Sequence, residues 1–194
     1  MLRLLILLSL CFSSFTHANA NNIFERKGIT LIKPDGWHWL GYKALRENSA
    51  VKLEKTGIPR PVITITKHKE PYNDVNSSMI VNKIELETKE NASNSYAVYR
   101  LELIKKRLGD DSIISTPKRI EVNGKAGTTF RYKDRFSVGG KEYQSFNEVT
   151  IIDIEPKVML LISTSQPTTT SPKFADLDTL NDAIQKMTFK KSKL

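Results

Sequence analysis

The stretch Tyr143–Ser163, with the sequence YQSFNEVTIIDIEPKVMLLIS, carries the clearest structural pattern in the chain. Val149–Ile152 and Val158–Ile162 have apolar side chains in both alternating sets of positions. Since successive side chains of a strand point to opposite faces, strands of this kind are covered on both sides. Glu155-Pro156-Lys157 between them is typical of a turn. The stretch therefore predicts two neighbouring strands in the interior of a sheet.

Turn sequences on the N-terminal side extend this pair into a meander. Asn123-Gly124 is a dipeptide preferred in two-residue hairpins, and Gly139-Gly140 suits the same kind of turn. Because hairpin-length turns join antiparallel neighbours, the sheet should be mainly antiparallel. The four strands expected here are Ile113–Val122, Thr128–Tyr132, Tyr143–Ile154 and Val158–Ser163.

Further strands are expected nearer the N-terminus. Ile29–Ile32 is followed by Lys33-Pro34-Asp35-Gly36, in which proline presets a turn and glycine takes the strained dihedral angle. Val62–Thr66 alternates apolar and hydroxyl side chains, and Ser78–Glu87 continues the β character, so these two strands can pair. Leu40–Lys55 has weak periodicity and is left unassigned.

Two segments have the period of an amphipathic helix. The first begins near Ser93 and stops at Gly109, and the second begins with Asp176 or a near neighbour as its N-cap. Their apolar faces consist of Ala97, Leu101, Ile104 and Leu108 in the first helix and Leu177, Leu180, Ile184 and Met187 in the second.

Two helices and a sheet with two buried faces predict an α+β protein. The expected architecture is an α/β/α sandwich, in which a mainly antiparallel, twisted sheet is covered by helices on both faces. The chain shows no internal repeat, and residues 21–194 have the length of one domain. We therefore expect a single domain over 21–194.

Residues 1–20 are typical of an export signal that is cleaved off. Arg3 gives a cationic start, Leu4–Phe12 an apolar core, and Ala18-Asn19-Ala20 a small-residue cleavage site in which Ala18 and Ala20 direct the cut after Ala20. The apolar core is far shorter than the roughly 20 residues that span a bilayer, and no later segment is long enough. We expect an exported protein without a transmembrane segment, located in a bacterial periplasm, with secretion to the outside left open.

The only cysteine, Cys11, lies inside this signal, so residues 21–194 contain no thiol. A lipid anchor on Cys11 is not expected, because Leu10 stands where a lipidation signal normally has a small residue. The chain has 30 Lys and Arg against 21 Asp and Glu, a formal net charge of +9, which becomes +8 when Arg3 is lost. Such a charge either favours anionic envelope components and acidic proteins or serves solubility alone. An exported protein is not expected to bind nucleic acid.

The chemistry-bearing residues predict no catalytic site, no metal site and no cofactor. Outside the signal the histidines are His38 and His68. A metal site could combine His68 with Glu70 and Asp74. The sequence lacks the paired histidine spacing of such sites, and a surface loop explains these residues. Gly139-Gly140-Lys141 lacks the further glycine spacing and the Ser or Thr of a phosphate-binding loop. No strained Gly-x-Ser-x-Gly segment presents a nucleophile.

Asp110-Asp111 is interpreted as loop sequence after the first helix rather than as a catalytic carboxylate pair. Lys105-Lys106-Arg107 suits the negative end of that helix, and Lys190, Lys191 and Lys193 form a basic C-terminal tail.

Trp37-His38-Trp39 is the local candidate for ligand binding. Because alternating residues point opposite ways, one tryptophan can be exposed, where it could stack on a ligand ring or enter lipid headgroups. The alternative is structural, with Trp37 anchoring the turn to the core and Trp39 packing under the Leu40–Lys55 segment. Whether Trp39 is exposed is left open.

The order of elements resembles the PsbP/Mog1-like fold family. The matching residues are Gly28–Trp37 with its Pro-x-Gly-Trp turn, the Asn123–Gly127 turn followed by Phe130-Arg131-Tyr132, and the late strand Leu160–Ser163. Members of this family include extrinsic photosystem subunits, a Ran-binding import factor and bacterial envelope proteins. The resemblance implies a binding or assembly scaffold without a shared active site, although fold analogy alone supplies no function.

Together these observations favour an exported, non-enzymatic binding or assembly-accessory protein, whose partner is an envelope protein or an anionic envelope component. The alternative is a small-ligand carrier or an unrecognised hydrolase with a pocket near Trp37 and His38.

Overall fold

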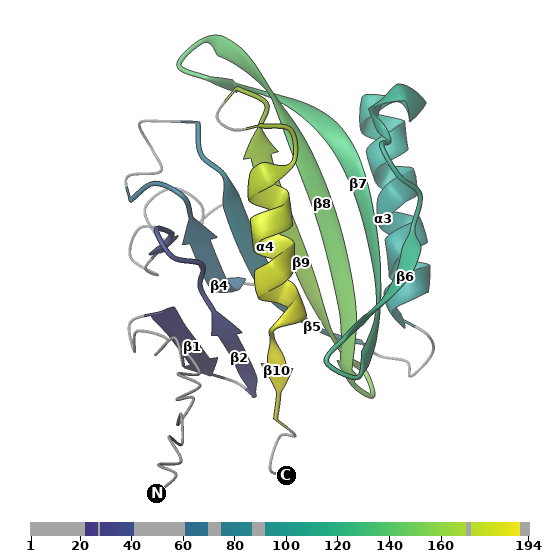
Figure 1. Cartoon of the computed structure of the whole chain (residues 1–194). Helices are drawn as coiled ribbons and strands as arrows, with labels where there is room; N and C mark the ends of the chain where they lie inside the picture. The colour runs from purple at the N-terminus through teal and green to yellow at the C-terminus, as the bar shows by residue number, and fades with distance from the viewer. Residues whose placement is uncertain are drawn as a thin grey trace, which may run out of the picture.

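The computed structural model describes residues 22–26, 28–40, 61–69, 75–86, 92–169 and 172–190. A seven-stranded antiparallel sheet, with the strand order β3-β4-β5-β9-β8-β7-β6, forms the body of the molecule (Figure 1). Its strands are β3 (His38–Trp39), β4 (Pro61–Thr66), β5 (Ser78–Glu85), β6 (Lys118–Val122), β7 (Lys125–Val138), β8 (Lys141–Glu155) and β9 (Val158–Pro167).

The predicted meander is β6-β7-β8-β9, and its turns have the predicted chemistry. Asn123 and Gly124 have φ of 47° and 75°, and Gly139 and Gly140 have φ of 58° and 79°. Both central residues of each turn are left-handed, as a tight hairpin requires. The predicted pairing of Val62–Thr66 with Ser78–Glu87 is confirmed by β4 and β5. Strands β7 and β8 are longer than predicted, because the apolar pattern does not mark their polar ends. The first predicted strand, Ile113–Val122, is too long, since β6 begins only at Lys118 and Ile113 forms an isolated bridge with Tyr132.

The apolar residues of β8 and β9 alternate between two clusters. Ile152 and Leu160 belong to one cluster, which includes Leu180 of α4 (Ala175–Gln185). Ile151 and Met159 belong to the other, which includes Ala97, Leu101 and Ile104 of α3 (Ala92–Leu108). The prediction that these strands are buried on both faces is therefore confirmed. The protein is α+β, with a mainly antiparallel sheet and two helices among its described residues.

A second, three-stranded sheet was not predicted. It has the order β1-β2-β10 and consists of β1 (Ile23–Arg26), β2 (Ile29–Ile32) and β10 (Thr188–Phe189). Ile29 and Leu31 of β2 are fully buried in the cluster that also holds α4 residues. That cluster is thus closed by a small sheet as well as by a helix, and a sandwich covered by helices on both faces is not confirmed.

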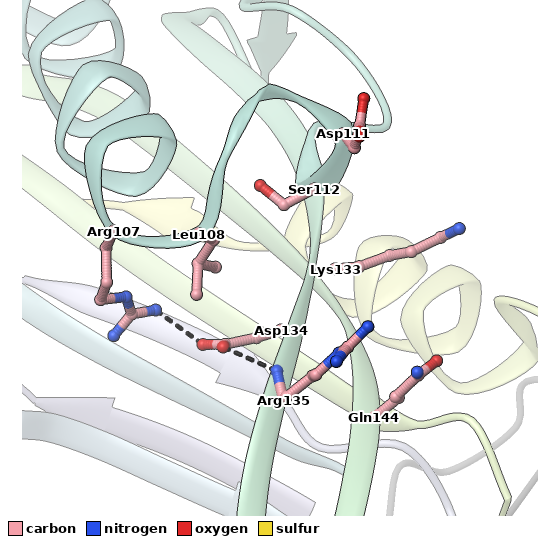
Figure 2. A pocket seen from close by; sticks show the side chains of 8 residues that line it. All are labelled: Arg107, Leu108, Asp111, Ser112, Lys133, Asp134, Arg135 and Gln144. Atoms are coloured by element: carbon pink, nitrogen blue, oxygen red, sulfur yellow. Dashed lines mark hydrogen bonds and ion pairs between the residues drawn. The ribbon is translucent and has the colours of Figure 1, made fainter.

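Helix α3 begins and ends close to its predicted bounds and is followed by a short 3-10 helix, η2 (Asp110–Ser112), where loop sequence was expected. In its last turn, Arg107 Nη2 donates to Asp134 Oδ2 of β7 at 2.6 Å (Figure 2). This contact ties the end of the helix to the sheet. Lys105 contributes a further ion pair with Asp110, 3.5 Å away.

The signal at residues 1–20 and residues 41–55 of the unassigned segment lie outside the described residues, as do Lys191 and Lys193. Lys190 of the basic tail is bonded through Nζ to Glu25 of β1. No helix of the described part is long and apolar enough to cross a membrane.

Candidate functional site

A groove lies between α4 and the edge of the large sheet. It has a volume of about 680 Å³. Its floor is formed by β7 and β8, one wall by the segment that leads into β6, and the other wall by α4. Its polar lining includes Thr116, Lys118, Thr129, Arg131, Glu148, Thr150, Asn181 and Gln185.

The floor is polar because the side of the sheet that faces α4 changes character along the strands. On β8, Ile152 and Ile154 face the apolar cluster near α4, whereas Thr150 and Glu148, which share that side, are polar. Both are buried, with Glu148 4% exposed. A buried charge is costly unless it is paired and hydrogen-bonded, so the surroundings of Glu148 need to supply partners.

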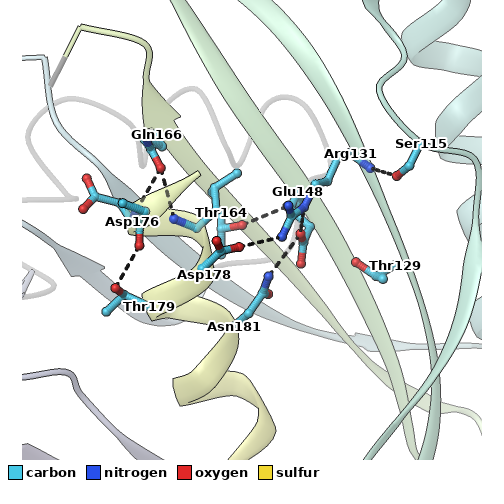
Figure 3. A network of polar contacts seen from close by, with 12 residues as sticks. Ser115, Thr129, Arg131, Glu148, Thr164, Gln166, Asp176, Asp178, Thr179 and Asn181 are labelled. Atoms are coloured by element: carbon cyan, nitrogen blue, oxygen red, sulfur yellow. Dashed lines mark hydrogen bonds and ion pairs between the residues drawn. The ribbon is translucent and has the colours of Figure 1, made fainter. Parts of the chain in front are cut away.

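Three side chains satisfy Glu148 (Figure 3). Arg131, directly opposite on β7, donates from Nε to Oε2. Asn181 of α4 donates from Nδ2 to the same oxygen at 3.2 Å, and Thr150 Oγ1 reaches Oε1 at a long 3.5 Å. The carboxylate therefore connects both strands of the hairpin to α4.

Arg131 is the second centre of the network. Its Nη2 donates to Asp178 Oδ1 of α4 at 3.1 Å, and its guanidinium carbon lies 4.9 Å from the ring centre of Phe174. Burial acts to lower the pKa of Arg131, but hydrogen bonds and charges from Glu148, and then from Asp178, outweigh burial and raise the pKa above its usual value. Arg131 thus remains a fixed cation between two carboxylates.

Helix α4 begins in a different way from the prediction. Its N-cap is Phe174, a non-glycine residue with φ of 65° and no side-chain cap. The amide of Gln166, fully buried on β9, takes over the capping. Its Oε1 accepts from the N–H groups of Asp176 at 2.9 Å (Figure 3) and Leu177 at 3.2 Å. Its Nε2 donates to Pro172 O at 2.8 Å. The N-cap is therefore a near neighbour of Asp176 and not Asp176 itself, and the side-chain acceptor comes from Gln166.

Asp176 is instead a second buried carboxylate with partners from another part of the chain. Ser77 Oγ donates to its Oδ2 at 2.5 Å, and Lys67 Nζ lies 2.7 Å from Oδ1. These contacts fix the first turn of α4 to the residue that follows β4 and the residue that precedes β5. The position of α4, and with it one wall of the groove, is therefore set by polar contacts as well as by apolar packing.

The sequence candidates Trp37, His38 and Trp39 lie away from this groove. Trp37 is 5% exposed and belongs to the core cluster. His38 and Trp39 are half-buried on β3, the sheet edge opposite β6, and the Trp39 ring lies 6.0 Å from that of Phe24. The three residues line neither the groove described above nor its rim.

The remaining candidates are dispersed. His68 is exposed, and its N–H and C=O are bonded to the Asn76 side chain at 3.1 Å each, whereas Glu70 and Asp74 lie outside the described residues. Within the described ranges no group of three His, Cys, Asp or Glu could hold a metal ion. Gly139-Gly140 is the predicted hairpin turn, and Asp110-Asp111 belong to η2.

Sequence reasoning missed the Arg131–Glu148 pair, although a signal for it existed. The Gly139-Gly140 turn places Val138 opposite Lys141. Counting seven residues away from the turn along each strand places Arg131 opposite Glu148. A glutamate inside a strand with two buried faces requires a partner. Register and charge together could have identified the pair.

No protein-family model matches the chain, and no curated protein matches it. Among solved structures, the chain is similar to a protein of Bacteroides thetaiotaomicron, with 14% identity and a TM-score of 0.46 over 89% of this chain and 49% of the other. It is similar to the Ran-binding protein Mog1p of Saccharomyces cerevisiae, with 14% identity and a TM-score of 0.48 over 84% and 90%. It is also similar to LpqN of Mycobacterium tuberculosis, which is involved in cell envelope biogenesis, with 13% identity and a TM-score of 0.46 over 90% and 87%.

Mog1p, which has the PsbP/Mog1-like fold that the sequence resembles, stands among these structures. The chain spans about half the length of the Bacteroides protein. At these identities and TM-scores the similarity supplies no function for this chain.

Proposed function

We propose that the protein is a non-enzymatic binding or assembly-accessory protein of the cell envelope, and that it holds its partner in the groove beside α4. In this proposal residues 1–20 are the cleaved signal, residues 21–194 form one domain in the periplasm, and the large sheet is the middle layer of an α/β/α sandwich. The partner is an envelope protein or an anionic envelope component.

The observation that carries the proposal is that the ionisable groups in the groove are bonded to one another. Glu148 is bonded to Arg131 and Asn181, and Arg131 is bonded to Glu148 and Asp178. A general acid or base needs a proton-transfer position within reach of a substrate, whereas these groups already engage one another. The pair supports a rigid floor, which suits recognition rather than proton transfer.

The rim supplies groups that a partner can reach. Thr116, Lys118 and Gln185 are exposed residues that line the groove. They provide a hydroxyl, a cation and an amide around a floor of Thr129 and Thr150 hydroxyls. Lys118 adds attraction for acidic groups, which matches the expected class of partner.

The test is complementation in a strain that lacks the gene, with envelope integrity measured as sensitivity to detergent. The full chain should restore integrity, and a chain without residues 2–20 should fail because it is not exported. Thr116→Trp combined with Gln185→Trp should also fail, because the two indoles fill the groove. Lys186→Trp, an exposed neighbour outside the groove, should restore integrity fully.

An intact envelope in the deletion strain, or full restoration by the groove-filled chain, would contradict the proposal. Thermal stabilisation of the purified protein by a small metabolite, retained in the groove-filled chain, would favour the carrier or hydrolase alternative near Trp37 and His38 instead.

A further inference from the structure

The outer edge of β7 is paired over only part of its length. Strand β6 pairs with Lys125–Thr129, and an isolated bridge joins Ile113 to Tyr132. Because Arg131 bonds to Ile114, the same bridge sets the Lys133 N–H toward Ser112. From residue 134 to residue 138, β7 is paired with β8 on one side, and no described residue pairs with it on the other. This part of the large sheet's edge is therefore open, next to a part that is paired.

The direction of the backbone groups along this edge follows from Arg131. Its N–H donates to Ser115 Oγ at 2.9 Å, and its C=O accepts from the N–H groups of Ile114 and Ser115, so both groups point away from β8. Backbone groups alternate along an antiparallel strand, and those of Lys133 and Arg135 therefore point outward too. The Arg135 N–H is held by Asp134 Oδ1 at 2.7 Å, a contact within the same strand that blunts the edge.

A hollow of about 540 Å³ lies at this edge, between β7 and the end of α3. It is bordered on the helix side by Arg107, Leu108, Asp111 and Ser112, and on the strand side by Lys133, Asp134, Arg135 and Gln144 (Figure 2). In the figure, Lys133 and Arg135 extend from one side of β7, whereas Asp134 points to Arg107 on the other. Space for an added strand is therefore present where the backbone groups are open.

The two sides of the edge differ in chemistry. On one side Lys133 and Arg135 are exposed, and neither forms an ion pair with a residue in the described part of the chain. On the other side Phe136 stacks on Tyr143 with ring centres 5.6 Å apart, and Val138 is 39% exposed. An incoming strand would meet cations with one set of alternating side chains. With the other set it would meet Asp134, which is paired with Arg107, and then the apolar Phe136 and Val138.

We propose that the edge of β7 from Asp134 to Val138 binds an extended segment of a partner protein as an added strand, and that this segment alternates acidic and apolar residues. Main-chain hydrogen bonds provide the affinity, and the alternating side chains provide the specificity. A second copy of this edge is disfavoured, because it would set Lys133 and Arg135 against identical cations. The inference rests on the β7 edge and holds whether or not the groove beside α4 is occupied.

The test measures binding of labelled peptides to the purified protein by fluorescence anisotropy. The probe is an eight-residue peptide that alternates Glu and Val, with capped ends. Its matched controls are a peptide with four Glu followed by four Val, the alternating peptide with N-methylated valines, and inorganic polyphosphate. We expect the alternating peptide to bind at least tenfold more tightly than each control.

Equal binding of the block peptide or of polyphosphate would overturn the proposal, since it would show attraction by charge alone. Equal binding of the N-methylated peptide would overturn it as well, because strand addition needs those N–H groups. Absence of binding by the alternating peptide would contradict it directly. None of these outcomes requires an altered protein that could fail to fold.

A charge reversal locates the site. Lys133→Glu with Arg135→Glu should weaken binding of the alternating peptide at least tenfold. Arg119→Glu with Lys186→Glu changes the net charge equally at exposed positions outside the hollow and should leave binding within twofold. Equal loss in both pairs of variants would place the interaction elsewhere. Slowed hydrogen exchange of the Ser137 amide, which points outward by the same alternation, would be the direct signature of the new strand.

Discussion

Arg131 of β7 lies directly opposite Glu148 of β8, and its Nε donates to a carboxylate that is almost completely shielded from water. The same guanidinium also bonds to Asp178, whose side chain is 65% exposed. One cation thus joins a buried and an exposed carboxylate. Its contact with Glu148 joins β7 to β8, and its contact with Asp178 joins β7 to α4.

These two contacts should differ in strength. Arg131→Ala leaves the Glu148 charge buried with weaker partners, and we expect a loss of about 2–3 kcal/mol in the free energy of unfolding, less than for a fully buried pair because Arg131 is partly exposed. Asp178→Ala removes a solvent-screened pair and should cost less than about 1 kcal/mol. Urea denaturation of both variants measures the difference. Equal losses would show that burial of Glu148 does not govern the network.

Gln166 should act as the cap of α4. Gln166→Leu leaves the N–H groups of Asp176 and Leu177 without their acceptor in a buried position, and we expect a loss of about 2 kcal/mol. Thr179→Ala removes an exposed side-chain bond within the same helix and serves as the control, with an expected change within about 0.5 kcal/mol. Thermal unfolding followed by circular dichroism compares them. A stable Gln166→Leu variant would mean that α4 does not depend on this cap.

Gly127 is expected to tolerate no side chain. A Cβ at this position would lie 2.6 Å from the backbone oxygen of Ile151 and 3.2 Å from Ile120 Cγ1, so β6 or β8 would have to move. Gly127→Ala should cost about 2 kcal/mol through overpacking. Ala126→Ser, at the exposed neighbouring position, should change stability by less than about 0.5 kcal/mol. If both variants unfold at the same urea concentration, the described register of β6 against β7 is wrong.

Tyr132 should make stability depend on alkaline pH. Burial raises the pKa of its phenol above 10.0, with a smaller contribution from the Asp134 charge. The folded state therefore favours the neutral phenol, so this contribution is complete below pH 10 and is lost as the pH rises through the raised folded pKa.

The measurement is the urea midpoint of the wild-type protein and Tyr132→Phe between pH 8 and pH 11. The variant should lose less stability over this range, because it has no phenol to ionise at that position. Tyr99→Phe, at a side chain that is 57% exposed, should follow the wild-type profile. Parallel profiles for Tyr132→Phe and the wild-type protein would contradict the assignment.

Local sequence patterns predicted the parts of the fold that local contacts determine. The hairpin turns, the meander and both helices follow from turn residues and periodicity over short segments. Their pairings bring together residues that are close in the sequence. In the small sheet, β1 pairs with β2 locally, as in the contact of Arg26 with Ile29, but β1 was not predicted. The pairing of β10 with β2, as in the contact of Thr188 with Thr30, joins residues far apart in the sequence, which no short-range pattern encodes.

The candidate site was missed for a related reason. Glu148 and Arg131 are ordinary residues in each strand considered alone, and only the hairpin register brings them together. The cap of α4 comes from Gln166 on β9, and its buried Asp176 is paired with Ser77, far away in the sequence. By contrast, the prediction for Trp37-His38-Trp39 rested on the aromatic residues alone, and whether they bind a ligand stays a prediction.

The measurement that tests the central claim most directly is photo-crosslinking in intact cells, with a photoreactive amino acid at Gln185 in the groove and, in a second strain, at exposed Lys186 just outside it. We expect an adduct of defined mass with an envelope component from position 185 only, and we expect Thr116→Trp to abolish it by filling the groove. Identical adducts from both positions, or an adduct from position 185 that persists with Thr116→Trp, would contradict a partner-binding groove.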